Sequence, residues 1–70
     1  MTKLGDIVNI LDMNEEVSIY ACGGEKALIF HGKLSAFPLE TYLGAKDMNV
    51  TCMYPVVEEG TAYLNIILGW

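Results

Sequence analysis

Apolar positions near the start of the chain follow the period of an α-helix. They recur at i, i+3, i+4 and i+7, and they are Leu4, Ile7, Val8 and Leu11. This spacing places one apolar stripe along a short helix and predicts a helix from Lys3 to Leu11. Thr2 precedes it and is the expected N-cap, because a side-chain hydroxyl can accept from a free backbone N–H of the first turn.

The period changes to two at Glu16, which predicts a half-buried strand over residues 16–22. Gly23 and Gly24 follow, and two glycines supply the positive φ angles of a tight hairpin turn. A second strand is therefore expected from Lys26 to Leu34.

Two registers remain open for this first hairpin. A two-residue loop places Val17 opposite Phe30 and Ile19 opposite Leu28, whereas a four-residue loop places Ile19 opposite Phe30 and Ala21 opposite Leu28. Both registers keep the apolar side chains on one face, so the pattern predicts the hairpin but leaves its register undecided.

A second short helix is expected to open at Ser35-Ala36-Phe37-Pro38, since Ser can cap free N–H groups and Pro is tolerated in a first helical turn. Its predicted inner face consists of Leu39, Tyr42 and Leu43. Gly44 is the expected C-terminal stop of this helix.

The last third of the chain predicts a second hairpin, with strands over residues 48–57 and 61–70. A three-residue loop of Glu58, Glu59 and Gly60 gives an all-apolar inner face. The opposed pairs are then Val56 with Ala62, Tyr54 with Leu64, Cys52 with Ile66, Val50 with Leu68, and Met48 with Trp70. This register predicts that Trp70 belongs to the core and that Cys52 is buried.

These elements give the order α-β-β-α-β-β in a single domain over residues 1–70. The expected fold is an α+β domain in which two β-hairpins form a four-stranded antiparallel sheet with two short helices. The alternative is a small, SH3-like bent barrel. Pro55 cannot donate a ladder hydrogen bond, so the third strand is expected at an edge or with a bulge at that position.

Composition suggests that the chain self-associates. Apolar residues make up 53% of the 70 positions, and a domain this small has little interior in which to bury them. We therefore expect a homo-oligomer. The alternative is that helices of the same chain cover both faces of the sheet.

The chain is acidic, with nine carboxylates against four basic residues and a formal net charge of −5. The four basic residues are all lysines, they are dispersed, and arginine is absent, so nucleic-acid binding is disfavoured.

No signal peptide or membrane-spanning run of about 20 apolar residues is present. Two cysteines are too few for a secreted disulfide framework, so a cytoplasmic protein without membrane contact is expected.

No recognisable constellation for catalysis or metal binding emerges from the sequence. Cys22 and His31 share a strand face, but either hairpin register separates them by roughly 13 Å or more at about 3.3 Å per residue. One histidine and two scattered cysteines give no metal-ligand spacing. We therefore predict a protein that is not an enzyme and that needs no cofactor.

The second faces of the two hairpins carry a predicted interaction surface. Its residues are Tyr20, Ile29, His31, Met53, Tyr63 and Ile67. Aromatic residues and Met are enriched at the centres of protein interfaces. This surface is the candidate contact site for a protein partner or a second subunit.

Three short sequence segments resemble small phage- or prophage-encoded proteins of Gram-positive bacteria. They are the opening L-x-D-I-V-x-I-L-D over residues 4–12, V-x-I-Y over residues 17–20, and I-F-x-G over residues 29–32. The resemblance implies a non-enzymatic inhibitor or sequestering protein that acts on a host factor.

The functional expectation is therefore a small acidic binding protein that engages a protein partner. The alternative is a sequestering protein that holds a metabolite or nucleotide between subunits, with Lys26, Lys33 and His31 available to a phosphate.

Overall fold

The computed structural model describes residues 2–22 and 26–69. The elements follow in the order α1 (Leu4–Val8), β1 (Glu16–Cys22), β2 (Lys26–Lys33), a 3₁₀ helix η1 (Leu34–Ala36), α2 (Leu39–Ala45), β3 (Asn49–Glu58) and β4 (Thr61–Gly69). The predicted order of helices and strands is confirmed. The Gly23-Gly24 turn and the pairing of Trp70 lie outside the described residues.

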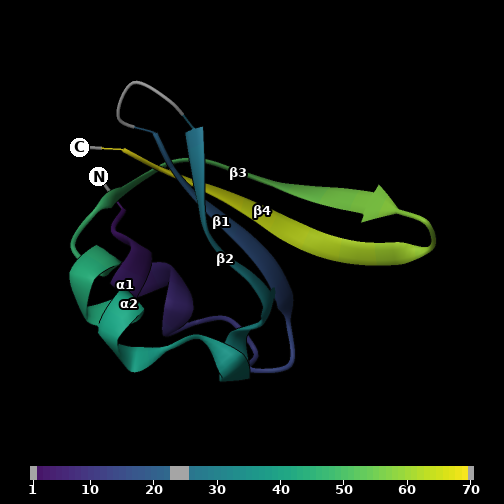
Figure 1. The fold of residues 1–70 in the computed structure, drawn as a ribbon, viewed down its shortest axis with the longest axis horizontal. Helices are drawn as coiled ribbons and strands as arrows, with labels where there is room; N and C mark the ends of the chain where they lie inside the picture. Colours follow the sequence, from purple (N-terminus) through teal and green to yellow (C-terminus); the bar gives the residue numbers. More distant parts are fainter. Residues whose placement is uncertain (1, 23–25, 70) are drawn as a thin grey trace.

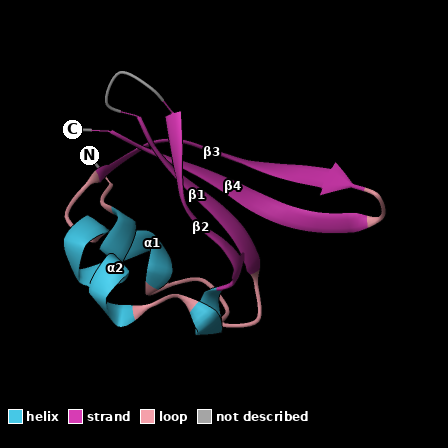
Figure 2. Ribbon diagram, in the orientation of Figure 1, coloured by secondary structure: helices cyan, strands magenta, loops and turns pink. Residues whose placement is uncertain are grey.

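The four strands form one sheet in the order β2-β1-β4-β3, with both helices at one end (Figures 1 and 2). Each hairpin is antiparallel, but β1 and β4 run parallel at the centre. The prediction of a purely antiparallel sheet is therefore wrong, and the sheet is mixed. The parallel contact pairs residues 17–21 of β1 with residues 64–68 of β4 and joins the two hairpins into one sheet.

The core lies between the helices and the central strands. It consists of the buried residues Leu4, Ile7, Val17, Ile19, Leu34, Ala45, Ile66 and Leu68. Backbone hydrogen bonds fasten the N-terminus to the start of β3, because Leu4 donates to the Met48 carbonyl and Val50 donates to the Thr2 carbonyl. The start of α1 is thereby held against the start of β3.

Both helices are shorter than the sequence predicted. α1 begins after Lys3, whose backbone N–H bonds the Asp6 carboxylate at 3.4 Å, so Thr2 is not the cap. α2 begins after Pro38 and ends at Ala45, beyond the predicted stop at Gly44.

The predicted inner face of α2 is confirmed only at Tyr42, which is half-buried and packs against Phe37. Leu39 is 68% exposed and Leu43 is 55% exposed, and Ala45 is the residue that α2 buries in the core. The small Ala45 side chain allows the helix to lie close to the core.

The turn between β3 and β4 has two residues, so the predicted three-residue loop is wrong. Glu59 and Gly60 both have positive φ, at 49° and 81°, and Glu58 pairs with Thr61. Positive φ at both central residues defines a type I′ turn, whose twist matches the twist of the flanking strands.

A bulge at Thr51 restores the expected pairing at the far end of this hairpin. Tyr54 pairs with Asn65 and Cys52 with Ile67, whereas Val50 pairs with Leu68 as predicted. The extra residue turns Cys52 away from the core, so this thiol is exposed rather than buried.

The first hairpin contains a second bulge, at Ile29. Ile19 pairs with Phe30, as the four-residue-loop alternative required, but Tyr20 pairs with Leu28 and Ala21 with Ala27. The bulge turns Leu28 outward, where it is 56% exposed.

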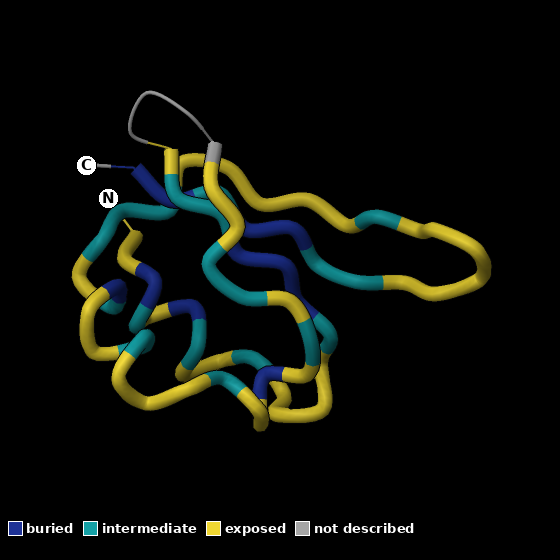
Figure 3. Tube along the Cα trace, viewed as in Figure 1, coloured by how far each residue is buried: buried dark blue, intermediate teal, exposed yellow. Residues whose placement is uncertain are grey.

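The distal part of the second hairpin, residues 53–64, extends beyond the helices and is called the arm below (Figure 3). Exposed residues dominate it, and Val57 at 73% is the most exposed of its large apolar side chains. β3 lies at the sheet edge, which confirms the position predicted from Pro55. The four strands form one open sheet with β2 and β3 at its two edges, so the alternative of a small, SH3-like bent barrel is not observed.

Candidate functional site: the open face of the sheet

The helices pack on one face of the sheet, and no element within residues 2–22 and 26–69 covers the opposite one. We call the opposite one the open face (Figures 1 and 2). Strand pairing assigns to it, among others, Ser18, Tyr20, His31, Cys52, Tyr54, Tyr63, Asn65 and Ile67. Aromatic side chains therefore concentrate on a sheet surface that described residues leave uncovered.

The structure brings together four of the six predicted site residues. Tyr20 lies beside Ile67 across the parallel pair of strands. The His31 and Tyr63 rings meet edge to face, with centroids 5.5 Å apart and an interplanar angle of 89°. These four side chains share the open face.

The other two predicted site residues point to the helix side of the sheet. Ile29 packs against the core cluster, and Met53 pairs with the core residue Ile66. The physical reason is the pair of bulges, because one extra residue in a strand reverses the side-chain alternation beyond it.

A row of polar side chains crosses the open face and was missed by the sequence analysis. It follows the strand pairs from His31 on β2 through Ser18 on β1 and Asn65 on β4 to Tyr54 on β3. Ser18 Oγ and His31 Nδ1 share a hydrogen bond, and Asn65 Nδ2 donates to Tyr54 Oη at 3.1 Å. The four-residue-loop register was the signal for this row, since it already placed His31 opposite Ser18.

The polar row contains one unmade hydrogen bond. Asn65 is only 8% exposed, and its Oδ1 atom is buried without a hydrogen-bond partner among the described residues. A buried polar atom without a partner costs about 1–3 kcal/mol of desolvation free energy. The open face thus retains a hydrogen-bond acceptor that the fold itself does not use.

The Ser18–His31 pair is unsuited to nucleophilic catalysis. Ser18 is 2% exposed, so a substrate carbonyl has no access to its hydroxyl. His31 remains four strand positions from Cys22, roughly 13 Å at about 3.3 Å per residue, so the predicted exclusion of a Cys–His pair agrees with the observed register. No group of three or more His, Cys, Asp or Glu side chains suited to a metal ion occurs in the described part of the chain.

A polar hollow of about 340 Å³ lies beside this row, where the arm leaves β1 and β2. We call it the acidic hollow, and its lining residues are Glu16, His31, Glu58, Glu59, Thr61 and Tyr63. Partial burial and the neighbouring Glu58 carboxylate raise the pKa of the Tyr63 phenol above its ordinary value. The environment of this ring therefore disfavours additional negative charge.

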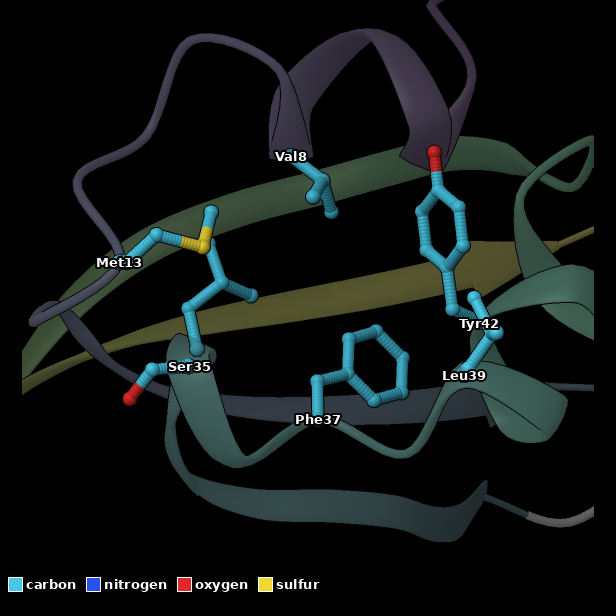
Figure 4. Close-up of a pocket in the computed structure, with 7 residues that line it drawn as sticks. Val8, Met13, Ser35, Phe37, Leu39 and Tyr42 are labelled. Atoms are coloured by element: carbon cyan, nitrogen blue, oxygen red, sulfur yellow. The ribbon is translucent and has the colours of Figure 1, made fainter.

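A second hollow, of about 220 Å³, is apolar and lies on the helix side (Figure 4). It is lined by Val8, Met13, Leu34, Ser35, Phe37, Leu39 and Tyr42. Phe37 stacks on Phe30 at 4.9 Å and meets Tyr42 edge to face at 6.0 Å, so aromatic packing fixes this wall. Few polar atoms line this second hollow, so it offers little to orient a ligand.

The chain matches no protein-family model, no curated protein and no solved structure. Among the helices of the described residues, none has the length and apolar character needed to cross a membrane. Functional inference therefore rests on the site geometry.

Proposed function

We propose that the chain is a non-enzymatic binding protein that engages protein surfaces, including further copies of itself, through the open face. The observation that carries this proposal is the uncovered sheet face with its cluster of Tyr20, Tyr54, Tyr63 and Ile67. Aromatic side chains supply large contact areas at low entropic cost and are enriched at interface centres.

Contact through a sheet face is favoured over strand addition at an edge. In a hairpin with a two-residue turn, the two residues that flank the turn form a hydrogen-bonded pair. Along the ladder, hydrogen-bonded pairs then alternate with pairs whose backbone N–H and C=O groups point away from the partner strand. Counting from Glu58 and Thr61, the Pro55 nitrogen faces away from β4, so the free edge of β3 lacks a donor at its centre. The other edge, β2, carries the bulge at Ile29, which also disfavours pairing with another strand.

The burial of Ser18 and the absence of a described metal-ligand cluster support binding rather than catalysis. A net charge of −5 would keep a protein with exposed apolar side chains in solution. Action on a host factor of a phage-infected cell remains a prediction from the sequence resemblance.

The test is the concentration dependence of molar mass, measured by light scattering on the full chain. Cys52→Lys places a charge on the open face, and Val57→Lys places the same charge on the opposite face of the same strand. We expect the wild type to self-associate, Cys52→Lys to weaken association, and Val57→Lys to retain it. A wild type that is strictly monomeric at high concentration, or the reverse order of the two variants, would refute the proposal.

The alternative function, sequestration of a metabolite or nucleotide, receives less support from this face. Glu16, Glu58 and Glu59 surround the hollow beside His31 and would repel a phosphate. A thermal-shift screen against nucleotides tests this alternative, since a ligand that binds only the folded chain must raise its Tm saturably.

A further inference from the structure

We propose that the acidic hollow receives the guanidinium group of an arginine side chain presented by the protein partner. The proposal rests on the proposed function, because it names the chemistry of the partner that the open face contacts. It adds a specific anchor at the junction between the polar row and the arm, beside the start of β1 and the end of β2 (Figure 1).

The hollow carries negative charge, because Glu16, Glu58 and Glu59 all line it. Lys33 lies opposite Glu16 in the strand register, but it forms no ion pair with these carboxylates in the part of the chain that the structure describes. Glu58 is hydrogen-bonded by the Tyr63 phenol, but an incoming cation would meet no competing cation at these carboxylates among the described residues.

Two aromatic rings also line the hollow. His31 and Tyr63 stand at 89° to each other and both line the hollow, so they form an aromatic corner beside the carboxylates. A planar guanidinium can lie over an aromatic ring while its N–H groups point in plane toward carboxylates. An ammonium lacks this shape, which favours arginine over lysine.

Hydrogen-bond acceptors dominate the lining of the hollow, because Glu16, Glu58 and Glu59 each contribute a carboxylate. An ionised carboxylate only accepts hydrogen bonds, so the lining has an excess of acceptors. A guanidinium carries five N–H donors and no acceptor, so it supplies donors to these acceptors.

The raised pKa of Tyr63 agrees with this assignment. Partial burial and the Glu58 carboxylate both favour the neutral phenol over the phenolate. The negative potential of the Glu58 carboxylate, which contributes to this pKa after partial burial, also stabilises a cation placed against the ring.

The experiment is an NMR titration of the isotope-labelled full chain with the blocked tripeptide acetyl-Gly-Arg-Gly-amide. The control peptide replaces Arg with citrulline, which keeps the shape of the side chain and removes its charge. We expect saturable shifts at the Thr61 and Tyr63 amides and the His31 ring with the Arg peptide, and none with the citrulline peptide. Raising the salt concentration should weaken the shifts.

A matched pair of variants locates the effect. Glu58→Gln removes a carboxylate from the hollow, and Glu40→Gln makes the same change on the exposed surface of α2. We expect Glu58→Gln to weaken binding of the Arg peptide by about 2- to 5-fold, the range of a solvent-exposed ion pair, and Glu40→Gln to leave it unchanged. A dispersed amide spectrum checks that each variant is folded.

Equal shifts with both peptides, equal weakening in both variants, or no saturable shift at the hollow would overturn the assignment. Its failure is separable from failure of the proposed function. The light-scattering comparison of Cys52→Lys with Val57→Lys uses no arginine ligand and reports on association through the open face alone.

Discussion

Gly69 and Thr51 form a contact that a single methyl group would disrupt. A Cβ atom built on Gly69 would lie 2.7 Å from the Thr51 Cγ2 methyl, well inside the 3.4 Å at which ordinary van der Waals contact begins. Thr51 is the bulge residue of β3, and its Oγ1 donates to the Ile67 carbonyl at 3.2 Å, which holds the methyl in place. Gly69→Ala should therefore overpack this corner.

The expected loss is about 1–3 kcal/mol, the usual cost of an added methylene in a well-packed site. For a domain of this size each kcal/mol lowers the Tm by about 4–8 °C. Thr51→Ser removes the obstructing methyl but keeps the hydroxyl that bonds Ile67. Added to Thr51→Ser, the Gly69→Ala change should cost less than about 0.5 kcal/mol, because the two sites are coupled by direct contact.

Chemical denaturation of the wild type, both single variants and the double variant measures this coupling. The free energies of unfolding give a double-mutant cycle, and far-UV circular dichroism confirms that each chain is folded. An equal loss from Gly69→Ala with Thr or Ser at position 51 would refute the packing argument and with it the position of the bulge.

Three further outcomes are expected. Glu59→Asn should raise stability by about 0.5–1 kcal/mol, since Asn-Gly suits a type I′ turn, whereas Glu59→Gln removes the same charge without that gain. Ultraviolet titration should show Tyr63 ionising above the ordinary tyrosine value of 10.0, and Glu58→Gln should lower its pKa. Because the folded chain holds this proton more tightly, the stability from Tyr63 should be complete below pH 10.0 and fall as pH rises through its folded pKa. Asn65→Val should raise the free energy of unfolding by about 1 kcal/mol through removal of a buried unpaired oxygen, and a clear loss in chemical denaturation would contradict that assignment.

Local patterns were sufficient to predict the elements of the fold. The apolar spacing from Leu4 to Leu11, the two hairpins and the edge position of Pro55 depend on residues near one another in sequence. The same patterns could not reveal the bulges, because Ile29 and Thr51 both suit an ordinary strand and nothing marks the extra position. Met53 and Cys52 were assigned to the wrong faces of the sheet because the prediction did not include the extra residue at Thr51.

The shared face of four of the six residues of the candidate site was predicted correctly, because the bulges do not affect their positions. Tyr20, His31, Tyr63 and Ile67 share a face because no bulge intervenes between them and the central strand pair. The polar row from His31 to Tyr54 needs the parallel contact of β1 with β4, which joins the two hairpins. Strand pairing between distant segments is not encoded in local periodicity, so the row became visible only in the folded chain.

The parallel contact also governs how the chain must fold. Val17 and Leu64 pair although they are 64 − 17 = 47 residues apart, whereas each hairpin closes through a short local loop. Hairpins form in about 1–10 μs, but an isolated two-stranded hairpin is at best marginally stable in water. Neither half of the chain can therefore hold its structure alone, since each completes the core of the other.

A chain divided between Phe37 and Pro38 should thus give two fragments that are unfolded apart and regain the sheet when mixed. Most of the free energy of folding would then appear as affinity between the fragments. The central strand pair makes this small domain behave, in energetic terms, like a heterodimer whose two subunits are joined by the short connection between η1 and α2.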